Sequence, residues 1–408
     1  MKKVLKLYRI RLKLESPLLV GYTPPDHNLY KTLSHIPSIT LRGGIATQLL
    51  EEFCQNDTNF GKCEICNKQD DCHFYEFFYK NIFSISNGLY LTQEKKNFEF
   101  CCDNPDLVPT HPLIKQCKRC ESDEKYINYL EEWQDENILY IRANCQNPDC
   151  NRKTTMDVLK NKNYCKNKDC RKILGTPETN FTISTAINYA KNSSLTGYLF
   201  TYSYILRDSI FDSYMLIEEN KKIYEFLSEL PFIRLGRSKS RGFGKVLIEL
   251  EEIDLNRKIE DNKGIINRMI KNNSLILAAK TNIVDFNMEE ESLDIITNPL
   301  INLNLALEYV KNKLNLNYEE FEDLFLLDET MGELETIGGW SFKTQQEKPH
   351  ITVAKPGSLY KFKINPEKKE YINEEIIKAI SFLEYIGLNN YSKLGYNLIY
   401  FPTMEELN

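Results

Sequence analysis

The chain has 408 residues, of which 42% are hydrophobic and 27% are charged, and its formal net charge is −6. This length exceeds what one hydrophobic core normally uses, so we expect two domains. The acidic balance gives a polyanion no attractive overall field, and no stretch is apolar enough to span a bilayer. The composition therefore excludes a membrane-spanning protein and a uniformly basic nucleic-acid binder.

The first predicted element is a strand over residues 4–14. Its apolar residues alternate with Arg9, Arg11 and Lys13, as in a strand that is buried on one face only. The same charges interrupt the apolar run that a signal peptide would need, so we expect no secretion signal. A helix with Thr40 as its cap is predicted next.

All 12 cysteines lie between Cys54 and Cys170. The stretch around them, residues 54–173, is polar and poor in long regular patterns. We therefore expect an insertion that metal ions hold together instead of a hydrophobic core. Without a secretion signal the chain is expected in the reducing cytoplasm, where paired cysteines act as thiolate ligands more often than as disulfides.

The spacing of the first cysteines predicts zinc. They include a Cys-x2-Cys knuckle, a turn that brings two sulfurs to one tetrahedral ion. This site is expected to use Cys54, Cys63, Cys66 and Cys72, with His73 as an alternative ligand. The later candidate ligands are Cys117, Cys120, Cys145, Cys150, Cys165 and Cys170.

The later cysteines are expected to hold at least one more zinc ion, and a third ion is left open. Their spacing does not decide how they divide, or whether Cys101 and Cys102 join them. Two alternatives stay open for these cysteines: small buried hydrophobic side chains, and ligands of an iron–sulfur cluster. No acid or base stands out beside them, so we expect the ions to be structural and not catalytic.

Strand patterns return after the insertion in "NFTISTAIN", "GYLFTYSYIL", "SYMLIEE" and "KVLIELEEI", with a helix over "NKKIYEFLSEL". Residues 256–272 are polar and are expected to be a linker or a short helix. The sequence therefore predicts an N-terminal domain over residues 1–255, which contains the insertion, and a C-terminal domain over residues 273–408. The segments 235–250 and 387–401 share the order of a glycine-bearing loop and a strand, as in an internal repeat.

The stretch "LGRSKSRGFGKV", residues 235–246, concentrates positive charge within an acidic chain. Its glycines permit positive φ and a close approach, so main-chain N–H groups can point at phosphate oxygens. Phe243 offers a ring on which a nucleobase can stack. We therefore predict an anionic partner for this loop. The alternative is a solvated turn with ordinary surface cations.

Three segments, "IPSITLRGGIATQLL", "STAINYAKNSSLTGYLFTYSYI" and "LGRSKSRGFGKVLI", resemble successive signatures of the RAMP superfamily of CRISPR proteins. The segment "IGGWSFKTQQEKPHITVAKPGSLYKFKI" is similar to the Gly-Trp and Gly-Ser segments of its large two-domain members. From residue 4 to residue 401, apart from the insertion, the chain most resembles the Csx-ten family of type III-D effectors. That family is related to the subunit that caps the 5′ handle of the guide RNA.

This resemblance implies an α+β fold of two ferredoxin-like, RRM-type domains with antiparallel sheets, the first of which carries the zinc-binding insertion. It implies a non-catalytic RNA-binding subunit of a type III CRISPR effector ribonucleoprotein in antiviral defence. Such a subunit would bind the 5′ handle of the guide RNA and dock to the large signalling subunit and the backbone subunits. The resemblance also allows target RNA as a partner. It implies no membrane partner.

The charge of the loop and the resemblance together predict the residues that contact RNA. Three of them belong to the N-terminal motif, where a helix N-terminus can receive a phosphate. The central motif also includes Thr185, Ala186, Ile187 and Gly197. The predicted RNA-contacting residues are Arg42, Gly43, Gly44, Asn188, Arg234, Gly236, Arg237, Lys239, Arg241, Gly242, Phe243, Gly244 and Lys245.

The second glycine-bearing loop, "GLNNYSKLGYN", departs from the family pattern because its charges are limited to Lys393. The C-terminal domain is therefore expected to contact protein more than RNA. Two other functions stay open. Related RAMP proteins cleave RNA with a histidine near the first helix, and here His35, or less well His27, would be that residue. A zinc-stabilised adaptor that binds only protein is the other alternative.

Overall fold

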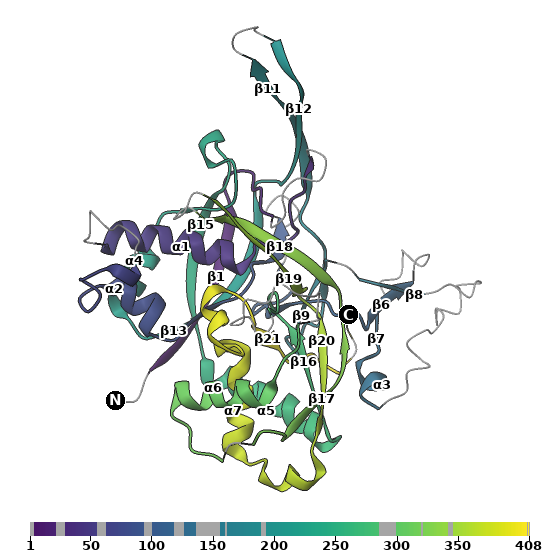
Figure 1. Ribbon diagram of the computed structural model, residues 1–408. Helices are drawn as coiled ribbons and strands as arrows, with labels where there is room; N and C mark the ends of the chain where they lie inside the picture. The colour runs from purple at the N-terminus through teal and green to yellow at the C-terminus, as the bar shows by residue number, and fades with distance from the viewer. Residues whose placement is uncertain are drawn as a thin grey trace.

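The structure is a computed structural model. It describes residues 4–21, 29–54, 63–93, 100–117, 126–135, 156–159, 161–188, 193–284, 299–319, 321–341, 346–405 and 407. The chain is a mixed α/β protein whose two principal sheets are antiparallel, as predicted (Figure 1). No helix in the described part of the chain combines the length and the apolar composition that a bilayer span requires.

A six-stranded sheet forms the centre of the N-terminal half. Its strand order is β14-β15-β1-β13-β3, and β4 also pairs with β13. The strands are β1 Leu5–Leu14, β3 Phe83–Ile85, β4 Leu89–Gln93, β13 Ser209–Glu218, β14 Ile233–Arg234 and β15 Lys245–Ile253. The strand predicted from the alternation at residues 4–14 is thus confirmed as β1, which lies between β13 and β15.

Helices cover one face of this sheet. They are α1 Ser38–Phe53 and α4 Lys221–Glu229. Three short helical segments lie between α1 and β3 in the chain: η1 Cys63–Ile65, α2 His73–Tyr75 and η2 Glu76–Lys80. Ile10 and Leu12 of β1 pack with Leu41 and Ile45 of α1 and with Leu227 of α4 in one buried cluster. The even-numbered residues of β1 therefore face the helices, as a strand with a period of two requires.

Helix α1 begins three residues earlier than predicted, since its cap position is residue 37 and not Thr40. Its first residue is Ser38, whose main-chain N–H donates to Oδ1 of Asn87 at 2.8 Å. The prediction of Thr40 as the cap is therefore wrong, because a side chain distant in sequence caps the helix. Such a partner leaves no local signature in the sequence.

The C-terminal half contains a four-stranded sheet with the order β17-β20-β16-β21. The strands are β16 Ser274–Ala279, β17 Phe325–Met331, β20 Leu359–Ile364 and β21 Ile399–Tyr400, and β18 Leu334–Ser341 pairs with β19 Gln346–Ala354 in a separate hairpin. The helices are α5 Leu255–Lys271, α6 Leu303–Leu314 and α7 Glu374–Ile386, with the short segments η5 Pro366–Tyr371 and η6 Asn390–Leu394.

Residues 256–272, predicted as a linker or a short helix, form the full-length helix α5. Asp254 caps it by accepting from the main-chain N–H groups of Asn256 and Arg257. Ile259, Ile266 and other apolar residues of one face are buried. Of the two alternatives, the helix is therefore confirmed, and it is longer than expected because a few apolar residues at helical spacing suffice to hold a helix that is otherwise polar.

The two halves repeat one strand order. In each half the first strand is central, the third lies beside it, and the fourth and second strands flank them: β15-β1-β13-β3 and β21-β16-β20-β17. Each half carries a β-hairpin between its second and third strands, and a glycine-bearing loop between its last helix and its fourth strand. The resemblance between segments 235–250 and 387–401 therefore extends to the whole topology.

The cysteine-rich insertion is built into the protein core. Its described elements are β5 Leu107–Pro109, β6 Ile114–Cys117, β7 Tyr126–Asn128, α3 Leu130–Gln134, β8 Met156–Val158, β9 Asn163–Cys165 and β10 Ile173–Leu174. Val108, Trp133 and Tyr164 belong to the same buried cluster as Ile276 of β16 and Phe362 of β20. The expectation of an insertion without a core is wrong, since short strands place scattered aromatic residues inward.

The insertion also covers the second face of the N-terminal sheet. Arg9 of β1 is only 3% exposed and donates to the carbonyl oxygen of Pro105, and the guanidinium of Arg11 lies 4.5 Å from the ring centre of Phe100. This face of β1 is thus covered more than the half-buried strand predicted, since Arg9 is buried and the side chain of Arg11 is only 23% exposed.

A long hairpin projects from the N-terminal half (Figure 1). It consists of β11 Thr179–Asn188 and β12 Ser193–Ile205, which pair antiparallel. Near its base, β12 pairs in parallel with the short strand β2 Leu29–Tyr30, so that Tyr202 lies opposite Tyr30. This pairing brings β2 and the base of the hairpin, which are distant in sequence, next to the loop of residues 235–246.

Candidate nucleic-acid interface and metal centre

The glycine-rich loop joins β14 to β15 and contains the short helical turn η4 Lys239–Arg241. Gly236 and Gly244 have φ values of 73° and 79°. A Cβ atom on Gly236 would lie 2.3 Å from the carbonyl oxygen of Leu19, and one on Gly244 would lie 1.9 Å from that of Leu235. These two glycines let the loop fold tightly against its own strand and the segment that follows β1.

The main-chain N–H groups of this loop are largely used within the protein. Gly244 donates to the carbonyl oxygen of Pro17 at 2.8 Å and Arg237 to that of Leu19 at 2.9 Å. The N–H groups of Arg241, Gly242 and Phe243 also donate to main-chain oxygens of the loop. The prediction that these N–H groups point at phosphate is therefore wrong for these residues, and the loop offers an anion its side chains.

The side chains of the loop form an arginine–aromatic cluster with the base of the hairpin. The guanidinium of Arg237 lies 5.4 Å from the ring centre of Tyr30, and that of Arg241 lies 5.2 Å from the ring centre of Tyr202. The two tyrosine rings stack with centres 5.1 Å apart. We call Tyr30, Tyr202, Tyr204, Arg237, Arg241 and Phe243 the arginine–aromatic cluster.

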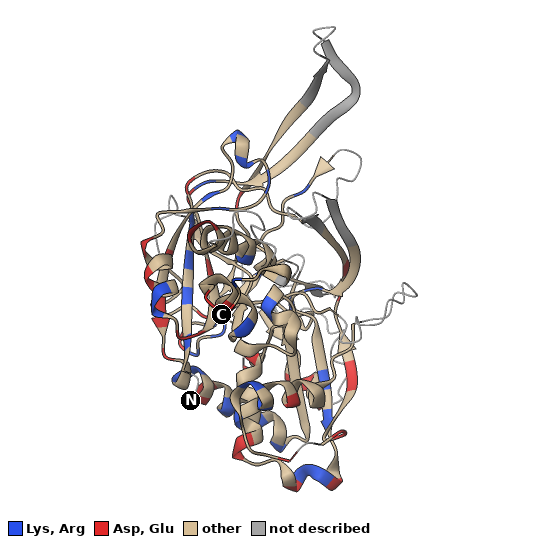
Figure 2. Ribbon diagram, turned by 60° about the vertical axis from the view of Figure 1, so that its left-hand side comes forward, with Lys and Arg blue, Asp and Glu red and all other residues tan. Residues whose placement is uncertain are grey.

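Strand register explains how the cluster forms. Tyr202 and Tyr204 are two residues apart on β12, so their side chains leave the same face of the hairpin. Tyr204 meets Phe243 edge-to-face, with ring centres 5.4 Å apart. Lys and Arg residues gather on the loop beside the hairpin base (Figure 2). Neither Arg237 nor Arg241 has a carboxylate ion-pair partner among the described residues.

Sequence reasoning did not assign Tyr202 and Tyr204 to the site. The signal was present in "FTYSYI", in which two tyrosines alternate with small polar residues on a predicted strand. What the sequence did not supply was the parallel pairing of β12 with β2. Without that pairing, nothing placed the hairpin beside the loop.

The other predicted cations of the loop have partners inside the protein. Lys245 forms an ion pair with Glu15 at 2.6 Å, and its Nζ also lies over the ring of Phe232. The guanidinium of Arg234 lies 5.8 Å from the centre of the same ring. Burial, and secondarily Arg234, lowers the pKa of Lys239. These residues surround the cluster without joining its rings.

The N-terminal motif lies in the second turn of α1, away from the helix N-terminus. The guanidinium of Arg42 stacks 5.0 Å from the ring centre of Phe78, and burial lowers the pKa of Arg42. A Cβ atom on Gly44 would lie 2.4 Å from Leu235. Gly44 thus lets α1 pack closely on the glycine-rich loop, and Gly43 next to it is exposed.

The N-terminus of α1 is occupied by the second glycine-bearing loop. The hydroxyl of Ser38 donates to the carbonyl oxygen of Gly395, and a Cβ atom on Gly395 would lie 3.0 Å from the N atom of Ile39. Nζ of Lys393 donates to the carbonyl oxygen of Tyr79 at 2.8 Å. The expectation that a phosphate meets this helix N-terminus is therefore wrong, since the other half of the protein covers it.

The central motif lies on the projecting hairpin. Thr185, Ala186, Ile187 and Asn188 are at the far end of β11, and Gly197 is on β12. Their side chains lie outside the part that the structure describes. Nearer the base, Phe181 and Ile183 of β11 are exposed on the face opposite Tyr202 and Tyr204.

His35 lies in a partly buried position. Its Nε2 atom is buried without a hydrogen-bond partner among the described residues, and burial lowers its pKa to about 4. A histidine with this pKa is neutral near pH 7 and is not set up to donate a proton. His27 lies outside the described residues.

Four cysteines of the insertion form one cluster. The Sγ atoms of Cys101, Cys102, Cys165 and Cys170 all lie within 4.8 Å of one another. The separation is 4.0 Å between Cys101 and Cys102, and 3.8 Å between Cys102 and Cys165. Zinc–sulfur bonds of about 2.3 Å in a tetrahedron put neighbouring sulfurs about 3.8 Å apart, so this cluster fits such an ion.

Hydrogen bonds favour the thiolate at Cys165, whereas the hydrogen bond with Cys165 and burial raise the pKa of Cys101, and burial raises the pKa of Cys102. Cys101 and the main-chain N–H groups of Asp106 and Asn167 lower the pKa of Cys165 to about 6, against the opposing effect of burial. Metal ions bind the thiolate, so these donors suit a ligand. Spacing left open whether Cys101 and Cys102 lie with the later cysteines; the structure places both beside Cys165 and Cys170, in a group that could hold a metal ion.

The first predicted quartet lines one small pocket. Cys54, Cys63, Cys66 and Cys72 surround it together with Gln69, Phe74 and Tyr75. Their sulfurs are not gathered within 4.8 Å of one another as those of Cys101, Cys102, Cys165 and Cys170 are, so a zinc ion at this quartet stays a prediction from the sequence. The main-chain N–H of Lys68 donates to Sγ of Cys66 at 3.4 Å, as in the turn of a zinc knuckle. His73, the alternative ligand, points elsewhere: Nε2 lies 3.1 Å from Nζ of Lys222, and Nδ1 lies 3.5 Å from Glu76.

Of the other predicted ligands the structure describes Cys117, which belongs to neither group. Cys117 is buried at the end of β6, and Cys120, Cys145 and Cys150 lie outside the described residues. For these four the metal site stays a prediction from the sequence.

The fold and the site together define a mixed α/β protein with a repeated antiparallel topology, a cationic aromatic loop and a cysteine centre. Comparison with known families gives the narrower class. The RAMP superfamily matches residues 11–247, more than half of the chain, and the protein belongs to that superfamily. This match contains the arginine–aromatic cluster and the described cysteine groups.

No curated protein matches this chain. Among solved structures it is similar to a chain of the type III-B Cmr-beta bound to cognate target RNA and AMPPnP, with 12% identity, a TM-score of 0.43, and 96% of this chain and 95% of that chain covered. It is also similar to a Cas6-related protein from Pyrococcus furiosus, with 10% identity, a TM-score of 0.35, and 98% and 100% covered. The family assignment rests on the match over residues 11–247.

Proposed function

We propose that this protein is a non-catalytic, RNA-binding subunit of a type III CRISPR effector ribonucleoprotein, of the Csx-ten, III-D type. In this role it holds the 5′ handle of the guide RNA and docks to the large subunit and the backbone subunits. Membership of the RAMP superfamily and the order of the sequence motifs support the proposal. The observation that carries it is the arginine–aromatic cluster.

The chemistry of the cluster suits single-stranded RNA. Stacked tyrosine rings offer faces on which unpaired bases pack, worth roughly 1–3 kcal/mol per base. A guanidinium that lies over a ring keeps its N–H edge free for phosphate oxygens. The stack of Tyr30 on Tyr202, with Arg237 and Arg241 over these rings, offers both in one place. The remaining predicted contacts, among them Asn188, Arg234 and Lys239, stay predictions from the sequence.

The fold supports the family's domain plan. The strand order that both halves share, with a helix after the first strand and another after the third, is the order of a ferredoxin-like domain. We therefore propose two such domains, 1–255 and 273–408, with α5 between them. We also propose that the first contains the insertion and holds structural zinc, one ion at the cluster of Cys101, Cys102, Cys165 and Cys170, which the geometry supports, and a second at Cys54, Cys63, Cys66 and Cys72, which the cysteine spacing supports.

The alternative function, a ribonuclease that uses His35, is less well supported because His35 is not protonated and cannot act as a general acid near pH 7. Burial keeps His35 neutral near pH 7 and leaves its Nε2 enclosed. The test is direct: purified protein is incubated with repeat RNA. Specific cleavage that His35→Ala abolishes would replace the non-catalytic role. An adaptor that binds only protein is less well supported, because that function does not explain the arginine–aromatic cluster.

The proposal is tested by removing the two arginines. In the assembled complex, Arg237→Ala/Arg241→Ala should weaken guide RNA retention at least about tenfold and lower the slope of affinity against salt by about two charges. Arg257→Ala, an exposed cation on α5, is the matched control and should leave both unchanged. Retention and salt dependence equal to those of the control would refute the assignment.

A further inference from the structure

A cavity in the C-terminal half is separate from the arginine–aromatic cluster. Its volume is about 490 Å³. Figure 1 shows α6 at the end of the molecule opposite the projecting hairpin. The cavity is lined by residues of α6, of the segment that leads from α6 to β17, and by Ile376 of α7. No RNA contact is predicted for any of these residues.

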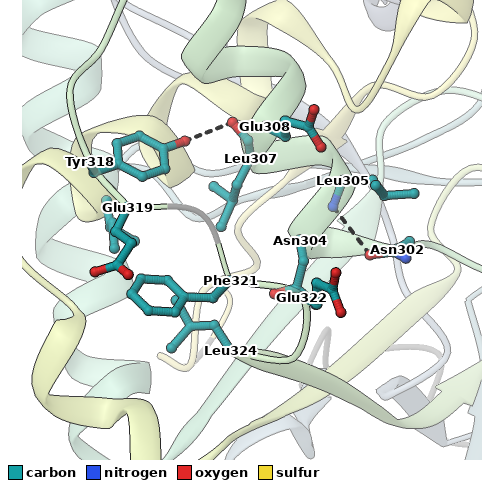
Figure 3. Close-up of a pocket in the computed structure, with 11 residues that line it drawn as sticks. Asn302, Asn304, Leu305, Leu307, Glu308, Tyr318, Glu319, Phe321, Glu322 and Leu324 are labelled. Carbon is teal, nitrogen blue, oxygen red and sulfur yellow. Dashed lines mark hydrogen bonds between the residues drawn. The ribbon is translucent and has the colours of Figure 1, made fainter.

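Hydrogen bonds within the chain fix the walls of this cavity (Figure 3). The hydroxyl of Tyr318 donates to the carbonyl oxygen of Leu307 at 2.7 Å, and Oδ1 of Asn302 accepts from the main-chain N–H of Leu305 at 3.2 Å. The side chain of Asn304 bonds the main chain of Phe325 in both directions. The neutral polar groups are thus occupied, and the wall offers a ligand its apolar side chains and carboxylates.

The lining combines apolar side chains with carboxylates. Leu305, Leu307 and Phe321 line it together with Glu308, Glu319 and Glu322. No lysine or arginine lines it among the residues that the structure describes.

Two lysines close to the cavity have their charged groups elsewhere than in its lining. Nζ of Lys311 lies over the ring of Tyr318, and Lys368 pairs with Asp323 beside Phe321. Glu308 and Glu319 have no ion-pair partner among the described residues. The cavity therefore repels nucleic acid and favours a cation.

Apolar surface continues outside the cavity. The side chain of Leu305 is 50% exposed, and Leu326 on the edge strand β17 is 48% exposed. Tyr371, which packs on Phe321 with ring centres 4.9 Å apart, is also exposed. An enclosed small molecule would leave these groups in water, whereas a polypeptide segment would cover them together with the cavity.

We propose that this cavity docks a basic, amphipathic segment of a partner protein. One apolar side chain of that segment enters between Leu305 and Phe321, and a lysine or arginine on each side of it pairs with Glu308 or with Glu319, which lie on opposite sides of the cavity (Figure 3). Burial of an apolar anchor that is flanked by ion pairs is the arrangement that concentrates binding energy at protein interfaces. The proposal does not rest on RNA binding by the opposite end of the molecule.

The first test uses a fluorescent amphipathic peptide of about 15 leucine and lysine residues and a matched peptide with glutamate in place of lysine. The full-length protein should bind the lysine peptide, and Glu308→Lys/Glu319→Lys should weaken that binding at least about tenfold. Glu229→Lys/Glu52→Lys makes the same change in net charge on exposed residues of the N-terminal half and should bind as the unmodified protein does. Leu305→Asp, at a half-exposed position that folding tolerates, should also abolish binding.

Three results would overturn the proposal: equal binding by the cavity variant and its control, equal binding of the glutamate peptide, or binding of single-stranded RNA that only the cavity variant loses. The second test places a photo-crosslinker at position 305 in the assembled complex. It should label a protein segment that carries lysine or arginine, and Glu308→Lys/Glu319→Lys should abolish the label. Replacing that lysine or arginine of the partner with glutamate should restore the label in this variant. A label on RNA or on an acidic segment, or no label, contradicts the proposal.

Discussion

At the scale of single residues, the glycines of the loop between β14 and β15 are not equivalent. Gly242 and Gly244 both have positive φ, 87° and 79°. Only Gly244 lies against another part of the chain, since a Cβ atom there would lie 1.9 Å from an oxygen of Leu235, whereas Gly242 has open space around it. One glycine therefore supplies only backbone conformation, and the other also permits close packing.

This difference predicts unequal effects of alanine. Gly242→Ala should cost about 1–2 kcal/mol, the penalty of a left-handed residue with a side chain. Gly244→Ala should cost more and weaken RNA binding, because the loop must move away from Leu235 and carry Arg237 and Arg241 with it. Thermal unfolding and RNA titration of both variants check this. Equal losses would mean that the close approach has no role.

Buried histidine is a second residue-scale feature. His111 is fully buried, neither ring nitrogen has a hydrogen-bond partner among the described residues, and burial lowers its pKa to about 3 from an ordinary value of 6.5. The unfolded chain therefore binds a proton at this residue at pH values where the folded chain does not. Its contribution to stability is complete above pH 6.5 and is lost as the pH falls towards 3.

His111→Leu should make the free energy of unfolding less sensitive to pH. Below pH 6.5 the slope should fall by up to about 1.4 kcal/mol per pH unit, which is the effect of one proton. Urea unfolding between about pH 7 and pH 5 measures it. His350→Gln, at an exposed position, should keep the slope of the unmodified protein. A slope unchanged in His111→Leu contradicts the prediction.

At the scale of elements, helix α7 links the insertion to both halves. Glu384 of α7 is 1% exposed and accepts from Nζ of Lys166 in the insertion at 2.7 Å and from Nζ of Lys280, just after β16, at 3.2 Å. Burial opposes its ionised form, but the two lysines outweigh burial and lower the pKa of Glu384. On the N-terminal sheet, the hydroxyl of Ser84 donates to the carbonyl oxygen of Tyr385.

Glu384→Gln should destabilise the protein by about 3–5 kcal/mol, because it leaves two buried lysines without their counter-charge. Glu374→Gln, on the exposed first turn of the same helix, should cost less than about 0.5 kcal/mol. Because the pKa of Glu384 is lowered on folding, its contribution is present above pH 4.5 and is lost as the pH falls below that value. Urea unfolding of the two variants at neutral pH compares them, and similar losses would rule out the buried network as the cause.

The helices and strands differ in how well the sequence predicted them. The strand at residues 4–14, helix α4 and the strands β11, β12, β13 and β15 were predicted by periodicity, which needs only neighbours along the chain. The cap of α1, the burial of Arg9 and the full length of helix α5 were not predicted, because each depends on a distant partner or on a few apolar residues in a polar stretch. The cluster was predicted in part: the loop gave Arg237 and Arg241, and only the pairing of β12 with β2 added the tyrosines.

At the scale of the whole molecule, the cysteine cluster lies where the insertion meets the N-terminal sheet. Cys165 and Cys170 pack with Leu89 of β4, Leu107 of β5 and Ile210 of β13. Cys165 is followed directly by Lys166, and the N–H of Asp106 donates to its sulfur. Asp106 and Lys166 both enter the buried charge network that reaches α5 and α7. A metal at this cluster therefore stabilises the contact between the insertion and both halves.

The two described cysteine groups predict different effects of metal loss. Purified protein should contain at least two zinc ions per chain, and Cys165→Ser and Cys54→Ser should each lose one. Cys165→Ser should lower the melting temperature by several degrees and expose amides of residues 100–117 and 161–174 to hydrogen exchange, because that metal joins segments that pack on both halves. Cys54→Ser should expose only residues 63–80. Full stability and protection in protein stripped of metal by a chelator, or the same exchange pattern in both variants, would show that the core holds the insertion without metal.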